Sequence, residues 1–323
     1  MKIVFHGANA RTFFDGFEAL LESPHELATV SDALAGEGEL ELYRAADVVV
    51  GTYSRAGQPP ISARLFQLPA AGFDGVHFAS LPEGCAVCNC FGHENAIAEY
   101  VMAALLARHV PLAEADGQLR RGDWHYWAGG PSGLRSELGA QSIGIVGHGH
   151  IGRTIAARAL AFGMEVQVAN RSPVAATGYA AIHDLSGLAD MAAQVDILIN
   201  TLPLNDSTAG LIGAEVLGAL GPHAIVMNVG RGPVIDEDAL YEVLSSRKIG
   251  GAIIDTWYVY PTPDQPHPLP GHHPFHELDN VTLTPHMSGW TTGTIARRQQ
   301  AIARNINSLA RGGALENRVD APA

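Results

Sequence analysis

Three side chains that can do chemistry each follow an apolar run in the C-terminal half of the chain. The runs and the side chains after them are 224–229 with Arg231, 251–254 with Asp255, and 281–284 with His286. Such runs predict buried strands, and ligands of parallel sheets bind beyond the carboxyl ends of the strands. These residues could reduce a 2-oxo acid. Arginine would hold the carboxylate and polarise the carbonyl, histidine would donate a proton near neutral pH, and aspartate could fix a nicotinamide carboxamide.

A glycine-rich motif supports a functional interpretation of these three residues. Without it, Arg231 could be a capping residue and His286 a core histidine. Gly147-His148-Gly149-His150-Ile151-Gly152 follows an apolar run at 143–146 and precedes a helical pattern at 153–162 and a second strand at 166–169. In this context G-x-G-x-x-G predicts a dinucleotide site. Gly147 allows the tight turn, Gly149 lets a pyrophosphate approach, and Gly152 lets helix and strand pack closely.

The residues after the second strand of this unit indicate which dinucleotide binds. NAD sites usually carry Asp or Glu there for the ribose 2′-hydroxyl, whereas this chain has Asn170-Arg171-Ser172. Arg171 can pair with a 2′-phosphate, and Asn170 and Ser172 can donate hydrogen bonds to it. A solvated loop arginine is the alternative. The sequence therefore favours NADP(H) over NAD(H).

Composition bounds the remaining classes. The 323 residues are 47% hydrophobic, enough for two cores, and carry a formal charge of −13 without a basic cluster, which argues against nucleic acid as a partner. The chain starts with a strand pattern and has no apolar run long enough to span a bilayer. We therefore expect a cytoplasmic protein that does not bind a membrane. Cys85, Cys88 and Cys90 are expected to be buried reduced thiols, with no metal site.

Alternating strands and helices along the whole chain predict an α/β protein with parallel sheets covered on both faces. Strands are expected at 2–5, 26–30, 47–50, 65–68, 85–90 and 196–200, and helices at 11–21, 94–109 and 294–310. Tyr53, Ala71, Gly72 and His93 then fall near one crevice at the strand ends. The polar and aromatic segment 120–138 joins the first domain to the glycine-rich unit. Its aromatic side chains are expected either in an interface with another chain or in core packing.

Several motifs together resemble the D-isomer-specific 2-hydroxyacid dehydrogenase family. They are the Gly147 unit, Asn228-Val229-Gly230-Arg231-Gly232 followed by Asp236, Ala239 and Leu240, and Thr284-Pro285-His286. The similarity covers about residues 65 to 290. It implies two doubly wound parallel-sheet domains: a Rossmann nucleotide domain, 94–290, inserted into a flavodoxin-like substrate domain made of 1–93 and 291–323. It also implies a homodimer built on the nucleotide domain.

The resemblance also implies residue roles. Arg231 would bind the substrate, His286 would be the acid/base, and backbone N–H groups around Ala71 and Gly72 would bind the substrate carboxylate. The substrate-binding candidates are Ala71, Gly72, Tyr53, His93 and Trp290. The cofactor-binding candidates are Gly147, Gly149, His150, Ile151, Gly152, Asn170, Arg171, Ser172, Leu202, Pro203, Val229, Gly230, Asp255, Ser288 and Gly289.

One departure from the family concerns the partner of the histidine. The family normally places a Glu before the Pro that follows the Asp255 strand, where it pairs with the catalytic His and raises its pKa. Tyr260 stands at that place. A phenol can hydrogen-bond an imidazole without supplying charge, so we expect Tyr260 or Tyr258 to orient His286 and the pKa of His286 to be lower than in Glu-containing relatives.

The stretch His286-Met287-Ser288-Gly289 also resembles the formate dehydrogenase branch, but His93 replaces that branch's Asn, and Ala71 is not the Lys of a phosphite dehydrogenase. Both differences count against a one-carbon or inorganic substrate. The histidine- and proline-rich loop 260–278 is expected to be a rigid surface loop that holds no metal.

The sequence therefore predicts an NADPH-dependent reductase of 2-oxo acids that forms D-2-hydroxy acids, with glyoxylate or hydroxypyruvate as candidates by resemblance. Two alternatives stay open: a dinucleotide-sensing protein without turnover, and an NAD-dependent dehydrogenase that works in the oxidative direction.

Overall fold

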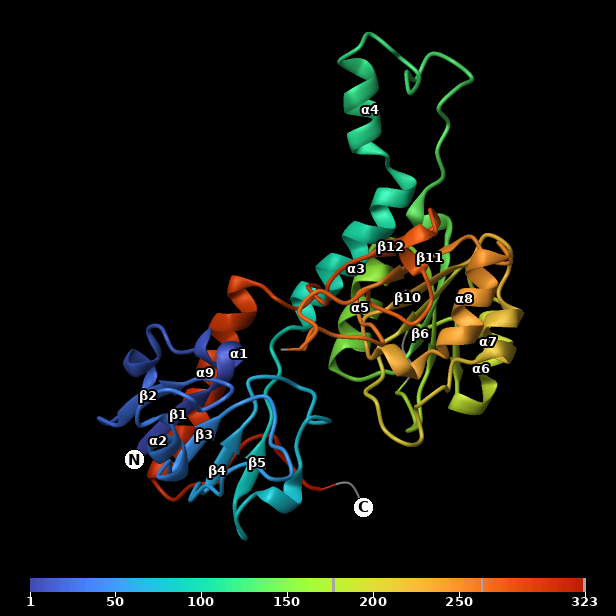
Figure 1. Ribbon diagram of the computed structural model, residues 1–323. Coiled ribbons are helices and arrows are strands. Elements are labelled where there is room, and N and C mark those ends of the chain that lie inside the picture. Colours follow the sequence, from blue (N-terminus) through green and yellow to red (C-terminus); the bar gives the residue numbers. More distant parts are fainter. Residues whose placement is uncertain (176–177, 263, 322–323) are drawn as a thin grey trace. The chain divides into compact units, whose positions relative to one another are not determined.

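The chain forms two compact units, shown in the computed structural model of Figure 1, which describes residues 1–175, 178–262 and 264–321. Unit 1 comprises Met1–His93 and Trp290–Ala323, and unit 2 comprises Glu94–Gly289. The boundaries expected from the sequence were 93/94 and 290/291. Unit 2 is thus one continuous segment, which lies between the two segments of unit 1 along the sequence.

Unit 1 contains a six-stranded sheet in the order β13-β5-β4-β3-β1-β2. The strands are β1 (Lys2–His6), β2 (Glu26–Val30), β3 (Val48–Val50), β4 (Leu65–Gln67), β5 (Ala86–Cys88) and β13 (Arg318–Val319). All pairs are parallel except β13 with β5. The helices are α1 (Gly7–Arg11), α2 (Glu39–Arg44) and α9 (Thr292–Ala310). The first five strands have the order 2-1-3-4-5, which is that of flavodoxin-like sheets.

Strand alternation gives unit 1 a core on each face of its sheet. Ile3 and Phe5 pack in one cluster with Ile302 and Ile306 of α9, while Val4 packs in the other with Tyr43 of α2. Two sequence predictions were wrong here. The helix expected at 11–21 is replaced by α1, a turn in which Gly16 has φ +74°, and a 3₁₀ turn at Phe17–Leu20. No α-helix joins β3 to β4 or β4 to β5 in the described chain.

Unit 2 contains a seven-stranded parallel sheet in the order β12-β11-β10-β9-β6-β7-β8. The strands are β6 (Ser142–Val146), β7 (Glu165–Ala169), β8 (Ala181–His183), β9 (Ile197–Asn200), β10 (Ile225–Asn228), β11 (Gly251–Ile254) and β12 (Val281–Leu283). The helices are α3 (Glu94–His109), α4 (Leu112–Leu119), α5 (His150–Ala161), α6 (Leu188–Ala192), α7 (Ala214–Ala219) and α8 (Glu237–Ser245). This is the Rossmann strand order, with its switch point between β6 and β9.

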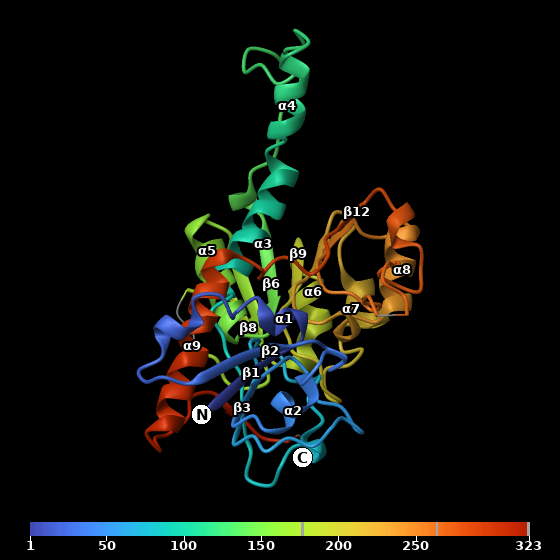
Figure 2. The same cartoon turned by 60° about the vertical axis from the view of Figure 1, so that its left-hand side comes forward.

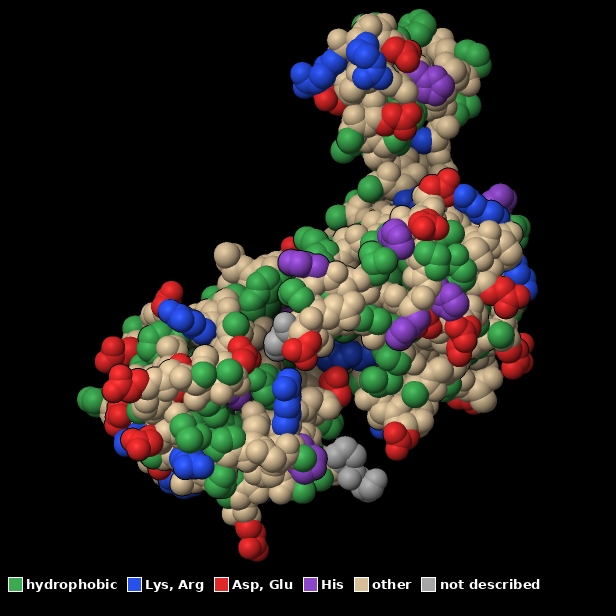
Figure 3. Space-filling view, in the orientation of Figure 1, with side chains coloured by type: hydrophobic (Ala, Val, Ile, Leu, Met, Phe, Trp, Pro, Cys, Tyr) green, Lys and Arg blue, Asp and Glu red, His purple; other side chains and the backbone are tan. Residues whose placement is uncertain are grey.

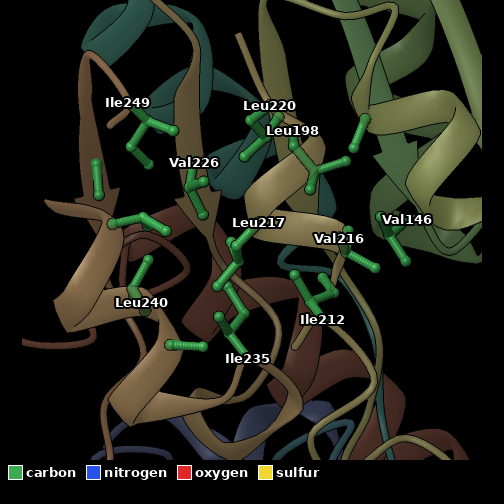
Figure 4. Close-up of a cluster of buried hydrophobic side chains, with 14 of the residues drawn as sticks. Val146, Leu198, Ile212, Val216, Leu217, Leu220, Val226, Ile235, Leu240 and Ile249 are labelled. Atoms are coloured by element: carbon green, nitrogen blue, oxygen red, sulfur yellow. The ribbon is translucent and has the colours of Figure 1, made fainter. Parts of the chain in front are cut away.

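Helices cover both faces of the unit 2 sheet. Figure 4 shows one core, in which Leu198 and Val226 of the sheet pack against Leu217 of α7 and Leu240 of α8. On the other face, α3 and α5 pack on β6 and its neighbours through residues such as Val101 and Ile155. The predicted fold class, α/β with two parallel-sheet domains, is confirmed.

A segment that we call the arm, α4 with residues 120–137, stands away from the sheet of unit 2 in Figures 1 and 2. It exposes five large hydrophobic side chains: Leu112, Leu119, Trp124, Trp127 and Leu134. Figure 3 shows hydrophobic side chains on the surface of this segment. Because Trp124 and Trp127 are 64% and 60% exposed, this segment is not core packing within the unit. Among the described residues no single helix is long and apolar enough to cross a membrane. The bent pair α3 and α4 meets that test only jointly, by length and composition.

Candidate active site

The glycine-rich turn after β6 has the backbone that a dinucleotide needs. Gly147 has φ +98°, a conformation that side chains rarely adopt. A Cβ on Gly152 would lie 2.0 Å from the carbonyl oxygen of Gly147, so the start of α5 can pack on the turn only through glycine. Around Gly149, no described atom other than those of the glycine and its chain neighbours lies within 4 Å of such a Cβ. The turn is therefore open at Gly149, His150 is exposed, and the α5 N-terminus offers N–H groups to a phosphate.

The end of β7 carries the residues expected to choose the cofactor. Asn170 holds the corner: its Oδ1 accepts a hydrogen bond from the His148 N–H at 3.1 Å, and its Nδ2 donates to the Ser172 carbonyl at 2.9 Å. Arg171 and Ser172 are exposed beside it. Asn170 thus shapes the corner, and Arg171 keeps a solvent-facing guanidinium at this strand end.

Sequence reasoning missed a second polar group at this corner. The imidazole Nε2 of His148 lies 2.7 Å from the Tyr179 hydroxyl, with the two rings edge to face. Burial, together with the nearby Arg153, lowers the pKa of His148, and burial raises the pKa of Tyr179. The sequence signal for this pair was His148 in the second position of the glycine-rich motif, because the turn itself does not require a polar side chain there.

Two buried asparagines at the ends of β9 and β10 shape the Arg231 segment. The Nδ2 of Asn200 donates to Oδ1 of Asn228 at 2.9 Å, and the Nδ2 of Asn228 donates to the Arg231 carbonyl at 3.1 Å. The Leu202 N–H donates to Oδ1 of Asn200 at 3.0 Å, and the Gly230 N–H donates to Oδ1 of Asn228 at 3.2 Å. The backbone of Arg231 is therefore fixed from both strands. Leu202, Val229 and Gly230 are buried in this arrangement, and Pro203 is exposed.

Asp255, at the end of β11, is fully buried and holds the segment that carries His286. Its Oδ1 accepts hydrogen bonds from the Thr284 hydroxyl at 2.6 Å and from the Met287 N–H at 2.9 Å. Its Oδ2 accepts one from the Ser288 N–H at 2.9 Å. The Tyr100 hydroxyl of α3 lies 2.7 Å from the Thr284 hydroxyl. The carboxylate thus binds both sides of His286, a positioning role that the sequence did not indicate.

His286 itself has φ +56° and an exposed side chain. Left-handed backbone is uncommon for a residue other than glycine, and strained backbone often occurs at functional sites when the surroundings enforce it. Here the enforcing contacts are those of Asp255 together with the bond from the His286 N–H to the Thr284 carbonyl at 3.1 Å. The imidazole is therefore presented to solvent from a fixed backbone.

The Tyr260 hydroxyl lies 2.9 Å from Nδ1 of His286. Tyr258, the other phenol considered, is engaged elsewhere: its hydroxyl donates to the Ile235 carbonyl at 3.0 Å, and burial raises its pKa strongly. Tyr260 also accepts a hydrogen bond from the Trp257 N–H at 3.1 Å. The indole of Trp257 is buried, and its N–H donates to the Thr284 carbonyl at 2.8 Å. One phenol therefore links the β11 end to the imidazole.

Arg231 and His286 follow β10 and β12, which flank β11 in the sheet. With neighbouring strands about 4.8 Å apart, the two strand ends are separated by roughly 10 Å. Arginine and histidine side chains starting at that separation can both reach one small molecule. Arg231 also donates from its guanidinium to the Gly230 carbonyl at 2.9 Å. The two residues stand on one edge of one sheet.

The loop after Tyr260 is bound to α8 through histidine and carboxylate pairs. His272 donates its backbone N–H to Glu237 and places Nδ1 2.8 Å from the same carboxylate, and His273 Nε2 lies 2.6 Å from Asp238. The His273 ring stacks on Tyr241. These contacts agree with a rigid surface loop. Among the described residues, no group of three or more His, Cys, Asp or Glu is placed to hold a metal ion.

The candidates of unit 1 lie mainly at the carboxyl ends of its strands. Tyr53 follows β3 and donates to Asp32 at 3.0 Å; burial raises the pKa of Tyr53 to about 12. Ala71 and Gly72 follow β4, and the Asn89 side chain donates to the Ala71 carbonyl at 2.7 Å. His93 is buried near the end of the first segment. Trp290 is 46% exposed and packs edge to face on Phe13, away from those strand ends in sequence.

The cysteines carry no site in this structure. None of the three forms a disulfide, Cys88 and Cys90 are buried, and burial raises the pKa of both Cys85 and Cys88 to about 11. Such thiols stay protonated and unreactive near neutral pH.

The fold of unit 2 and its glycine-rich turn define a protein of the Rossmann dinucleotide-binding class. Residues 102–288, more than half of the chain, match the sequence profile of the D-isomer-specific 2-hydroxyacid dehydrogenase NAD-binding domain. The chain belongs to the D-isomer-specific 2-hydroxyacid dehydrogenase family.

Relatives show how far the similarity extends. The chain is 31% identical over 212 residues to a hydroxyphenylpyruvate reductase of Plectranthus scutellarioides, which covers 66% of this chain and 63% of that protein. It is 32% identical over 262 residues to a glyoxylate reductase of Aeropyrum pernix, covering 80% of this chain and 76% of that protein. The chain thus spans less than two thirds of the first of these relatives.

A solved structure extends the likeness over nearly the whole chain. It is the NADPH-dependent glyoxylate/hydroxypyruvate reductase of Sinorhizobium meliloti in complex with NADP and malonate. The TM-score is 0.76 at 26% identity, and the match covers 98% of this chain and 96% of that one.

Proposed function

We propose that this chain is an NADPH-dependent reductase that converts a 2-oxo acid to a D-2-hydroxy acid by reversible hydride transfer. The observation that carries the proposal is the common position of Arg231 and His286 at the carboxyl edge of the unit 2 sheet, with Tyr260 on the imidazole. Glyoxylate and hydroxypyruvate are the first substrates to test, because two of the similar proteins are named for them.

The residues present fit a bound dinucleotide. The open position at Gly149 and the N-terminus of α5 suit the pyrophosphate. The exposed Arg171 suits a 2′-phosphate, which is the reason to prefer NADP(H). Leu202, Pro203, Val229 and Gly230 at the ends of β9 and β10 and Ser288 and Gly289 after β12 are assigned to the rest of the cofactor. When bound, the nicotinamide would supply or accept the hydride.

The protein's own residues would do the remaining work. The guanidinium of Arg231 would hold the carboxylate and withdraw charge from the carbonyl oxygen. His286 would donate the proton that the developing alkoxide needs, and Tyr260 would keep the imidazole oriented. In unit 1, the backbone N–H groups of Ala71 and Gly72 are assigned to the substrate carboxylate, with Tyr53, His93 and Trp290 as further substrate contacts.

The assignment is tested by following NADPH oxidation with a panel of 2-oxo acids that runs from glyoxylate and hydroxypyruvate to aromatic acids, and by determining the chirality of the product on a chiral column. Turnover with a D product supports the proposal. Tight NADPH binding without turnover on any acid would instead support a dinucleotide-sensing protein, which the uncharged Tyr260 in place of a Glu slightly favours. A preference for NAD and the 2-hydroxy acid would support the oxidative dehydrogenase.

We also propose a homodimer formed through unit 2, with the arm in the interface. The arm exposes Trp124, Trp127 and Leu134, and large exposed apolar side chains gathered on one segment mark interaction surfaces. Light scattering coupled to size exclusion checks this. The wild type should have twice the chain mass, and the double variant Trp124→Ser and Trp127→Ser should shift toward the monomer. A monomeric wild type at micromolar concentration would contradict the proposal.

A further inference from the structure

His148 lies in the glycine-rich turn, at the corner where the adenosine ribose of a dinucleotide is expected. Its backbone N–H donates to Oδ1 of Asn170 at 3.1 Å, and Asn170 is the first residue after β7. In Rossmann dinucleotide sites the residues after this strand meet the ribose 2′ position. The His148 side chain therefore starts beside the place where a 2′-phosphate would lie.

The imidazole of His148 is held by an aromatic partner. Its Nε2 lies 2.7 Å from the Tyr179 hydroxyl, and the two ring centroids are 5.3 Å apart at an interplanar angle of 81°. Tyr179 in turn packs against the apolar core that α3 and α5 form with the sheet. In the part of the chain that the structure describes, the other ring nitrogen, Nδ1, makes no hydrogen bond. The ring is thus anchored through one nitrogen only.

The charges that border His148 are positive. Burial, and secondly the charge of Arg153 in the first turn of α5, lower the pKa of His148. The same guanidinium opposes the rise that burial produces in the pKa of Tyr179. Arg171 after β7 and Arg153 are both exposed, whereas His183 at the end of β8 is bonded to a side chain of β7. The imidazole is therefore neutral near pH 7, with two guanidinium groups on the elements next to it.

A phosphate at this corner would reverse that balance. A phosphate monoester carries close to two negative charges at pH 7. Beside His148 it would favour the protonated imidazole directly, and by pairing with Arg153 it would also reduce the repulsion. Both nitrogens of a protonated imidazole donate, whichever one carries the proton in the neutral ring. Nε2 would then donate to the Tyr179 oxygen, and Nδ1 would be available to the phosphate.

We propose that His148 is a second recognition group for the 2′-phosphate of NADP(H), beside Arg171, and that it takes up a proton from water when this phosphate binds. The inference rests on the proposed use of NADP(H). The proton stays on the imidazole while the cofactor is bound and takes no part in hydride transfer. NAD(H) has a hydroxyl at the same place and brings no charge, so its binding leaves His148 neutral.

The sign of the pH dependence follows from this difference. The pKa of His148 is low in the free protein and is raised by the phosphate in the complex, so the complex binds more protons than the free protein between these two values. The affinity for NADP(H) therefore increases as the pH falls through that interval, while the affinity for NAD(H) does not.

Isothermal titration of the full chain in buffers of different ionisation enthalpy counts the protons taken up. At about pH 7.5 the free 2′-phosphate is almost fully dianionic and contributes almost no protons itself. We expect about 0.3 to 0.7 proton to be taken up with NADP⁺ and about none with NAD⁺. His148→Gln cannot take up the proton but keeps the backbone bond to Asn170, and it should abolish the uptake. His223→Gln is the matched control, because that exposed histidine precedes β10 at the opposite end of the strands.

The ratio of the two dissociation constants, Kd for NAD⁺ over Kd for NADP⁺, gives a second readout. In the wild type this ratio should rise about five- to tenfold between about pH 8.5 and 6.5, and in His148→Gln by less than about twofold. Equal proton uptake in the wild type and His148→Gln would overturn the inference, as would a wild-type ratio that does not change with pH.

These outcomes are distinct from those that test the reductase. Proton uptake with NADP⁺ in a chain that turns over no 2-oxo acid would leave His148 as a phosphate-binding group of a dinucleotide-sensing protein. Turnover with NADPH but no proton uptake with NADP⁺ would retain the reductase and remove His148 from phosphate recognition. A chain that binds NAD⁺ and not NADP⁺ would overturn both the preference for NADP(H) and this inference.

Discussion

The carboxyl edges of the two sheets differ in how they present polar groups. In unit 2, buried side chains fix an exposed imidazole: Asn200 and Asn228 shape the Arg231 segment, and Asp255 holds both sides of His286. In unit 1, Asn89 donates to the Ala71 carbonyl, and Tyr53 donates to the Asp32 carboxylate. His6, at the carboxyl end of β1, is buried between Tyr43 and Tyr53.

The difference shows that similar parallel sheets can do different kinds of work. In unit 2, buried hydrogen bonds orient ionisable groups that face solvent. In unit 1, His6 at the carboxyl end of β1 is kept out of water. The proposed proton donor of unit 2 must be accessible, whereas the proposed carboxylate-binding loop of unit 1 needs only fixed donors, so we expect variants at the two edges to behave differently.

The largest effect is expected for His286→Asn. Asparagine tolerates left-handed backbone, so the φ of +56° is no obstacle, but the proton donor is lost. We expect kcat for reduction to fall about 10²- to 10⁴-fold while NADPH affinity, measured by fluorescence titration, stays the same. His276→Asn is the control, because that side chain contacts Glu277 in the surface loop. A loss of less than about fivefold at His286 would remove it from the acid/base role.

Asp255→Asn should weaken both stability and activity. The amide keeps one acceptor oxygen where the carboxylate receives three hydrogen bonds in a fully buried position. We expect the free energy of unfolding to drop by about 1 to 3 kcal/mol, measured by urea denaturation. Asp279→Asn is the matched control: its ion pair with Arg247 is exposed, and its loss should cost less than about 1 kcal/mol. Equal effects at the two positions would contradict the positioning role of Asp255.

Arg171→Ala should separate the two cofactors. The guanidinium at the end of β7 is expected to pair with the 2′-phosphate, and losing one such charge-assisted bond of about 1.5 kcal/mol raises Kd about tenfold. We therefore expect weaker NADPH binding and unchanged NADH binding in isothermal titration. NADH serves as the internal control. If the ratio of the two affinities does not change, the preference for NADP(H) does not come from Arg171.

The smallest effect is expected at His6 and concerns stability against pH. Burial lowers the pKa of His6, and nearby Asp32 offsets this only in part. The native state then resists protonation while the unfolded chain takes up a proton below about pH 6.5, so this contribution to stability is present above that pH and is lost as the pH falls. In His6→Phe, the free energy of unfolding should fall less between pH 7.5 and 5.5 than in the wild type, by up to about 1 kcal/mol. A steeper fall in the variant would mean that His6 gains charge in the native state.

Much of unit 2 could be predicted because its signals are local. The glycine spacing predicts the turn, and the structure shows why: φ is positive at Gly147, and a side chain at Gly152 would collide with the Gly147 carbonyl. The apolar runs predicted strands in the right places, because a strand buried on both faces is written as a continuous apolar segment. The partner of His286 was also narrowed to two tyrosines, and Tyr260 is the one in contact.

Most of the failures occur where contacts between distant segments decide. One failure is local: α1 ends at Arg11, and a left-handed Gly16 separates it from a 3₁₀ turn where a helix over 11–21 was expected. The pairing of His148 with Tyr179 joins residues 31 positions apart. The hydrogen bonds from Met287 and Ser288 to Asp255 span more than thirty positions, so no local pattern indicated that this carboxylate positions the histidine.

By itself, the order of residues determined the two parallel sheets, the glycine turn, and the strand ends at which Arg231, Asp255 and His286 stand, because periodicity and backbone sterics act over a few residues. Only the tertiary structure decided which phenol contacts the imidazole and that the Trp257 N–H donates to that phenol. It also decided that the Asp255 carboxylate holds the segment that carries His286. The physical reason is that hydrogen-bond direction depends on where donors from separate strands converge, and that convergence exists only after the sheet has formed.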